Sequence, residues 1–110
     1  MLFRSLYKIN TSTLVVSSIT SPLFNYPNGI AINTSSGDVY VVNTGSGDTD
    51  SSILKITSDG TVSTFLDGSV TSNMLCKPIG AAISGSYLYV TNGVCTTNST
   101  YASSVIKISL

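Results

Sequence analysis

Apolar and polar residues alternate along most of this chain with a period of two, which is the spacing of half-buried β-strands. Short runs rich in Val, Ile, Leu, Thr and Tyr are separated by clusters of Gly, Asn, Asp and Ser. No run shows the 3.6-residue period of an amphipathic helix. The chain is therefore expected to be all-β. The pattern predicts strands over residues 5–9, 13–19, 29–33, 39–43, 52–57, 61–66, 80–84, 87–91 and 103–109.

The chain also repeats itself. Residues 27–43 read Pro-Asn-Gly-Ile-Ala-Ile-Asn, then a polar turn, then Val-Tyr-Val-Val-Asn, and a looser copy begins at Pro78. Lys8, Lys55 and Lys107 occupy the same place in three further strands. These landmarks recur at about fifty residues, and four short strands in such a period are typical of one β-propeller blade.

The residues that carry the repeat resemble a known family. Pro-x-Gly-Ile-Ala-Ile, a Gly-Asp turn, Val-Tyr-Val, an apolar-Lys-Ile strand and an Asp-Gly turn resemble an NHL repeat over residues 27–66. They are also similar to blades of gluconolactonase-like and streptogramin-lyase-like propellers. Residues 78–109 match more loosely, with Ala82 where a branched residue is usual.

The resemblance implies how the strands divide among blades, whose strands a to d run outward from the axis. Residues 5–19 would supply strands c and d of one blade, residues 27–66 a full blade, and residues 78–109 strands a, b and c of a third. Propellers close with about four to eight blades, so this chain supplies an incomplete ring. Either it is an excerpt of a longer propeller, or several copies complete one. Three copies would give six blades with one surplus c strand.

Composition narrows the partners that can be expected. Charged residues make up only 9% of the chain and the formal net charge is zero, so no basic surface for nucleic acid is expected. No apolar run approaches the length of a membrane-spanning helix, and no signal peptide is visible. A surface kept soluble by hydroxyls and amides favours an extracellular or cell-surface location. The chain has no His, the commonest general base.

The two cysteines are candidates for a disulfide. In the blades that the resemblance implies, Cys76 lies in the loop before the third blade and Cys95 between that blade's strands b and c. Those loops emerge on one face, so a Cys76–Cys95 bond is sterically possible. It would close a loop of about twenty residues and contribute roughly 3 kcal/mol in the chain-entropy model. The alternative is two unpaired thiols.

Metal binding is the second candidate chemistry. In gluconolactonase-like propellers a Pro-Asn-Gly at the mouth of the inner strand supplies an Asn ligand to a divalent metal. Pro27-Asn28-Gly29 matches that motif, but the next repeat has Ile79 at this place and no companion Glu exists. Alternatively, Asn28 adopts an unusual φ before Gly29 and hydrogen-bonds its own backbone.

Asp48 and Asp50 lie in the loop after residue 43, where alternating carboxylates suit Ca²⁺. This loop and Asp67 would share one face, so a weak calcium site there is conceivable. The alternative is a solvated turn, because the Glu and Gly of an EF-hand loop are missing. No catalytic residue is identified.

The expected function is a binding or assembly scaffold that acts through the long polar loops, and its partner would be a protein, further copies or further blades. The first alternative is a metal-dependent hydrolase or lyase whose remaining site residues come from other blades or copies. The second is a structural, self-assembling shell protein. The residues expected on the binding face are Asn28, Asp48, Asp50, Asp67, Asn73 and Asn92.

Overall fold

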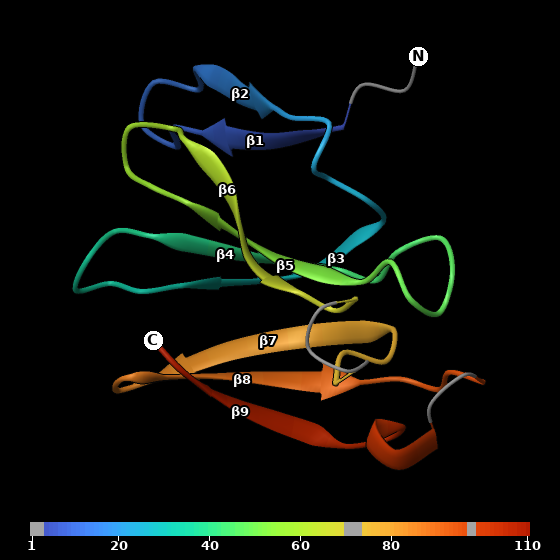
Figure 1. Ribbon diagram of the computed structural model, residues 1–110. Helices are drawn as coiled ribbons and strands as arrows, with labels where there is room; N and C mark the ends of the chain where they lie inside the picture. Colours follow the sequence, from blue (N-terminus) through green and yellow to red (C-terminus); the bar gives the residue numbers. More distant parts are fainter. Residues whose placement is uncertain (1–3, 70–73, 97–98) are drawn as a thin grey trace.

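The chain folds into antiparallel sheets of two, four and three strands, seen in a computed structural model that describes residues 4–69, 74–96 and 99–110 (Figure 1). Over these residues no sheet closes on itself, which is consistent with partial propeller blades. The all-β prediction is confirmed. The strands are β1 (Ser5–Ile9), β2 (Val16–Thr20), β3 (Pro27–Ile32), β4 (Val39–Asn43), β5 (Ser52–Ile56), β6 (Val62–Asp67), β7 (Pro78–Ser84), β8 (Tyr87–Asn92) and β9 (Val105–Ser109).

Two of the strand starts that differ from the sequence prediction have a local explanation. β2 begins three residues later than expected because the Asn10 side chain accepts the backbone N–H groups of Ser12 and Thr13, which holds them in a turn. β9 begins at Val105 because Ser103 has a φ of 54°. The 3₁₀ turn at Ser99–Tyr101 was not predicted. Among the described residues, no helix is long and apolar enough to cross a membrane.

Both Pro-x-Gly motifs form the same bulge. In β3 the register shifts between Pro27 and Gly29, and in β7 it shifts in the same way between Pro78 and Gly80. The residue between Pro and Gly therefore has no partner on the neighbouring strand. Gly29 is needed at its place because a Cβ there would come within 2.6 Å of the Ile79 carbonyl oxygen on β7. β3 and β7 can lie this close only because residue 29 has no side chain.

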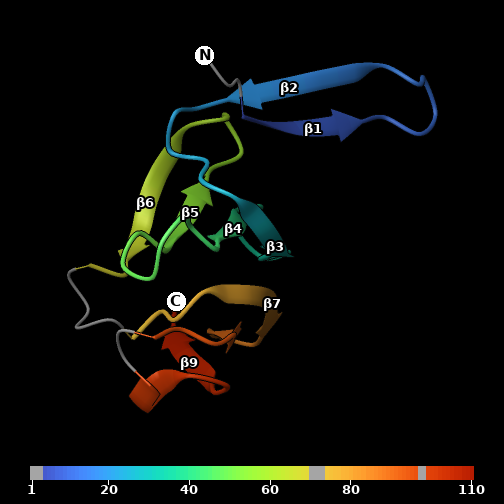
Figure 2. The same ribbon diagram turned by 90° about the vertical axis from the view of Figure 1, so that its right-hand side faces the viewer.

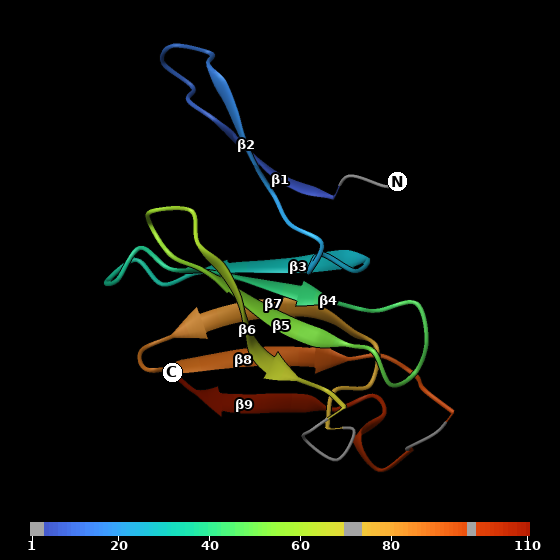
Figure 3. The same ribbon diagram turned by 45° about the horizontal axis from the view of Figure 1, so that its top comes forward.

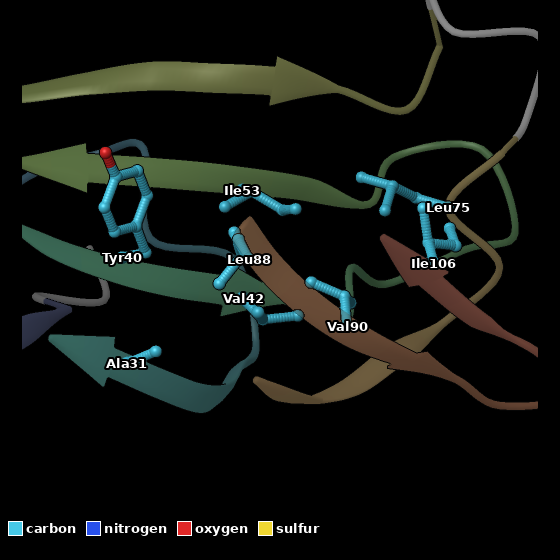
Figure 4. Packing of buried hydrophobic residues seen from close by; sticks show 8 residues of the cluster. All are labelled: Ala31, Tyr40, Val42, Ile53, Leu75, Leu88, Val90 and Ile106. Atoms are coloured by element: carbon cyan, nitrogen blue, oxygen red, sulfur yellow. The ribbon is translucent and has the colours of Figure 1, made fainter. Parts of the chain in front are cut away.

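The main core lies between the four-stranded and three-stranded sheets, which stack face to face in Figure 1. Figure 4 shows side chains from both sheets meeting there. Alternate positions of each strand point into this layer, as the period-two pattern requires. The fully or nearly buried members are Ala31, Tyr40, Val42, Ile53, Leu75, Leu88, Val90 and Ile106.

A second, smaller core lies on the opposite face of the four-stranded sheet. Phe24, Val41, Leu54 and Ile56 form it, with side chains of the β1–β2 hairpin packed against them. Figures 2 and 3 show that this hairpin extends well beyond the sheet that it touches. One face of the four-stranded sheet is therefore covered by a neighbouring three-stranded sheet, and the other only by two strands.

Candidate functional site

The polar loops that were expected to bind a ligand lie at one end of the strands. The start of β3, the β4–β5 loop and the end of β6 meet there because adjacent strands are antiparallel. In Figure 1 the β4–β5 loop forms the right-hand end of the four-stranded sheet. We call residues 21–28, 44–51, 67–69, 74–77 and 92–104, as far as they are described, the loop end. Asn73, one of the predicted binding-face residues, lies outside the described residues.

A buried Asn at the end of β4 holds the loop end of the four-stranded sheet together. The Asn43 amide donates to the Leu23 carbonyl oxygen and to Ser52 Oγ, each at 2.9 Å. Its Oδ1 accepts the backbone N–H of Asn25 at 3.1 Å. One side chain therefore ties the segment before β3 to the start of β5.

The three-stranded sheet contains the same clamp at the end of β8. The Asn92 amide donates to the Met74 and Tyr101 carbonyl oxygens and to Ser104 Oγ. Its Oδ1 accepts the backbone N–H of Cys76 at 3.1 Å. Asn92 was expected on the binding face, but its side chain is buried and its polar atoms bond within the chain. It positions the loops.

The predicted disulfide is confirmed. Cys76 and Cys95 are bonded, both are buried, and their Cα atoms are 5.5 Å apart. The bond joins the segment before β7 to the β8–β9 loop. Together with the Asn92 clamp, it fastens this loop to the sheet by a covalent and a polar link.

In the β4–β5 loop, Asp50 fastens the loop to the sheet by hydrogen bonds. Its Oδ2 accepts the Ser46 hydroxyl at 2.5 Å and the Asn25 amide at 3.1 Å, and its Oδ1 accepts the Gly47 N–H at 2.7 Å. These bonds, with the Ser46 hydroxyl contributing most, hold the pKa of Asp50 well below its usual range. The carboxylate organises its own loop and joins it to the segment before β3.

Asp48, two residues earlier, joins the two large sheets. Its Oδ2 accepts the Thr96 hydroxyl at 2.5 Å and the Thr96 backbone N–H at 2.7 Å. Lys77 Nζ lies 3.3 Å from its Oδ1. The two bonds from Thr96, assisted by Lys77, lower the pKa of Asp48 to about 2.

Asn28 is the exposed bulge residue of β3. Its amide donates to Thr44 Oγ1 at 2.6 Å, and the Thr44 hydroxyl donates to the Pro78 carbonyl oxygen at 2.7 Å. The chain of bonds thus runs from one sheet to the next. The left-handed backbone conformation anticipated beside Gly29 occurs instead at Tyr26, whose φ is 51°.

Asp67 lines a depression of about 550 Å³ at the loop end, together with Arg4 and Asp50. Arg4 donates to the Phe24 carbonyl oxygen at 2.7 Å. The Ser69 hydroxyl and backbone N–H both donate to Asp67 and lower its pKa. The charged groups that line the depression are thus bonded within the chain.

Asp48 and Asp50 share a loop but use their carboxylates on different partners. Within residues 4–69, 74–96 and 99–110, no group of three His, Cys, Asp or Glu side chains is placed to hold a metal. The Asn28, Asp48 and Asp50 metal site therefore stays a prediction. The hydrolase or lyase alternative stays one too.

Five residues to which sequence reasoning gave no role make polar contacts at the loop end: Asn25, Asn43, Thr44, Lys77 and Thr96. A signal for the clamp was present, because Asn ends both the Val-Tyr-Val-Val-Asn strand and the equivalent Tyr-Val-Thr-Asn strand. An Asn recurring where a strand meets a loop indicates a side chain that bonds backbone groups.

Comparison with known proteins agrees with this geometry over part of the chain. Residues 24–47 match the family model of the NHL repeat. This segment contains β3, β4 and the Asn43 clamp. Searches of curated proteins and of solved structures found no match.

Proposed function

We propose that this all-β chain, which contains an NHL repeat at residues 24–47, is an assembly scaffold whose outer sheets are completed by protein. The observation that supports the proposal is a difference in exposure. Several repeat positions that are buried in the four-stranded sheet are exposed in the two- or three-stranded sheet. By the repeat predicted from the sequence, these exposed positions correspond to buried ones, and we infer that another protein surface covers them.

The N-terminal hairpin shows the difference on β1, which corresponds to β5 through the shared Lys-Ile ending. Leu54 on β5 is 1% exposed, whereas Tyr7 at the matching place on β1 is 67% exposed. Ile56 is buried and Ile9 is exposed in the same way. This face of β1 lacks a covering sheet.

The three-stranded sheet shows the difference on its outer face. Ile53 of β5 is fully buried, whereas Val105 at the matching place on β9 is 65% exposed. Val42 is buried, and its counterpart Thr91 is exposed. Exposed apolar side chains that share a face favour contact with another protein surface.

Assembly through sheet faces is better supported than binding through the loop end. The polar atoms of Asp50, Asn43 and Asn92 are engaged within the chain, whereas the side chains of Tyr7 and Val105 are 67% and 65% exposed. The proposed setting is extracellular or at a cell surface. The Cys76–Cys95 bond supports that setting, since disulfides persist in oxidising compartments.

The test measures mass in solution and the fluorescence of an apolar dye. We expect the 110-residue chain either to exceed 11.5 kDa or, as a monomer, to bind the dye strongly. A Tyr7→Asp/Ile9→Asp variant should lose much of whichever signal is present. Leu14→Asp is the matched control, because Leu14 is 75% exposed but lies in the β1–β2 turn. A monomer that binds no dye would contradict the proposal.

A further inference from the structure

An apolar groove runs between the β1–β2 hairpin and the start of the four-stranded sheet. Its volume is about 400 Å³, and we call it the β3 groove. Ile30 and Ile32, both on β3, are 50% and 56% exposed along it. Its lining includes Tyr7, Lys8, Ile19, Ile30, Ile32 and Val39.

The same chain shows what fills an equivalent space. By the repeat, Ile30 and Ile32 of β3 correspond to Ala81 and Ile83 of β7. The side chains of Ala81 and Ile83 pack against the main core. They are covered there by the face of the β3–β4 hairpin that carries Tyr40. The β3 groove therefore has the shape of a site for a two-stranded hairpin of the β3–β4 type.

Within the described residues, β7–β8 is a second hairpin of this type. The face that corresponds to the Tyr40 face of β3–β4 is not covered by another sheet there. In β7–β8, Ala82, Tyr89 and Thr91 stand where β3–β4 has Ala31, Tyr40 and Val42. Ala82 and Thr91 are exposed and Tyr89 is half-buried. A groove and the element that fits it thus lie at opposite ends of one chain.

The edges of the strands match as well as the faces. Among the strands that the structure describes, β1 pairs only with β2, and its other edge has no neighbour there. Residues 6–9 of β1 read Leu-Tyr-Lys-Ile, and residues 105–108 of β9 read Val-Ile-Lys-Ile. β9 pairs with β8 so that Lys107 faces Tyr89. β1 has the same pattern and can adopt the same register, with Lys8 opposite Tyr89.

We propose that the β3 groove receives the β7–β8 hairpin of a second copy of this chain, and that β1 takes the place of that copy's β9 beside β8. The proposal rests on the assembly function proposed above. It covers Ile30 and Ile32 with the hairpin and makes Tyr7 and Ile9 part of a four-stranded sheet shared by two copies. Lys8 would replace Lys107, whose Nζ lies 3.9 Å from the centre of the Tyr87 ring.

Such an interface is head-to-tail, because each copy offers a groove at one end and a hairpin at the other. It can therefore be blocked separately on its two sides. Ile32→Asp places a charge in the groove, and Ala82→Asp places one on the hairpin. Both residues are exposed in the single chain, so both variants should fold, which circular dichroism checks.

We expect the unmodified chain to form oligomers and each variant to be a monomer. An equimolar mixture should form 1:1 dimers, because the Ala82→Asp chain keeps its groove and the Ile32→Asp chain keeps its hairpin. Leu14→Asp should assemble like the unmodified chain. A monomeric unmodified chain would overturn this inference, and dye binding by that monomer would leave the assembly function standing. Failure of the mixture to dimerise, or dimers of either variant alone, would overturn it also.

The exchange of β1 for β9 has its own readout. A Lys8→Cys chain mixed with a Tyr89→Cys chain should form a disulfide between the two chains under mild oxidation. Lys8→Cys mixed with a Ser17→Cys chain is the control, because Ser17 faces Lys8 within the β1–β2 hairpin. Equal cross-linking in both mixtures, or none in either, would overturn the exchange.

Discussion

The four-stranded and three-stranded sheets fasten their loop ends with the same clamp but with different chemistry around it. In each sheet a buried Asn at the end of the second strand bonds the segment before the first strand. Beside this clamp the three-stranded sheet has the Cys76–Cys95 disulfide. By the repeat, those two places are Asn25 and Ser46 in the four-stranded sheet. There the Asp50 carboxylate accepts hydrogen bonds from both.

The comparison teaches what this repeat requires at its loop end. The carbonyl and N–H groups that each clamp bonds are wholly or partly buried, so they need partners where the chain turns into the first strand. The amide of an Asn satisfies them in both sheets. The second link joins the segment before the first strand to the loop after the second strand, and its chemistry differs between the two sheets. A covalent bond and a bridging carboxylate both hold the loops, but one depends on redox conditions and the other on pH.

Removing the disulfide should have the largest effect. We expect Cys76→Ser/Cys95→Ser to lose about 3 kcal/mol of unfolding free energy, because the bond closes a loop of about twenty residues. Urea unfolding with and without a reductant measures this. Reduction should destabilise the unmodified chain to the same extent and leave the variant unchanged. A redox-independent midpoint in the unmodified chain would show that the bond contributes nothing.

Removing each clamping Asn should lower the stability of the two loop ends by different amounts. Asn43→Ala should cost about 1–3 kcal/mol, since it leaves partly buried backbone groups of Leu23 and Asn25 without their partner. Asn92→Ala should cost less while the disulfide still holds its loop. Under reducing conditions the two variants should lose comparable amounts of stability. A smaller loss for Asn43→Ala than for Asn92→Ala in the oxidised protein would contradict the proposed roles.

The sequence predicted most of the fold because alternation is a local signal. β1 and β4 have the predicted bounds, and the Asp-Gly turn is present at Asp59 and Gly60, where Gly60 has a φ of 88°. The start of β2 was wrong because it depends on the Asn10 side chain bonding residues that otherwise look like strand. A side chain that caps a turn in this way does not change the alternation of apolar and polar residues, so alternation cannot reveal it.

The loop end was less predictable, because its bonds join residues far apart in the sequence. The disulfide could be proposed because the loops that carry Cys76 and Cys95 were expected to emerge on one face. Asp48 and Asp50 were expected to face a ligand. Their partners come from other segments, Thr96 for Asp48 and Asn25 for Asp50. Alternation gives the face of a strand but not the direction of a loop side chain.

Moving the disulfide into the four-stranded sheet tests whether the two loop ends are equivalent. Asn25→Cys/Ser46→Cys should form a second bond and lower the oxidised mass by two further hydrogens. The gain in unfolding free energy should be smaller than the roughly 3 kcal/mol of a bond of this loop length, because Asp50 loses two donors. Asn25→Ser/Ser46→Ala is the control that removes the donors without the bond. Two free thiols under oxidising conditions would show that the positions are not equivalent.

The smallest effect we expect is on acid stability. The pKa of Asp50 is lowered on folding, so its contribution is complete above pH about 4, near the pKa of an unfolded Asp, and is lost as the pH falls below that value. Asp50→Asn should cost about 1 kcal/mol at neutral pH through weaker hydrogen bonds, and less at pH 3. Asp48, with a pKa of about 2, adds to the same slope. Urea unfolding at pH 3 and pH 7 measures the difference.

The Cys76→Ser/Cys95→Ser variant should keep the slope of the unmodified chain, because a disulfide does not titrate. An unchanged slope in Asp50→Asn would show that this carboxylate does not hold the loop.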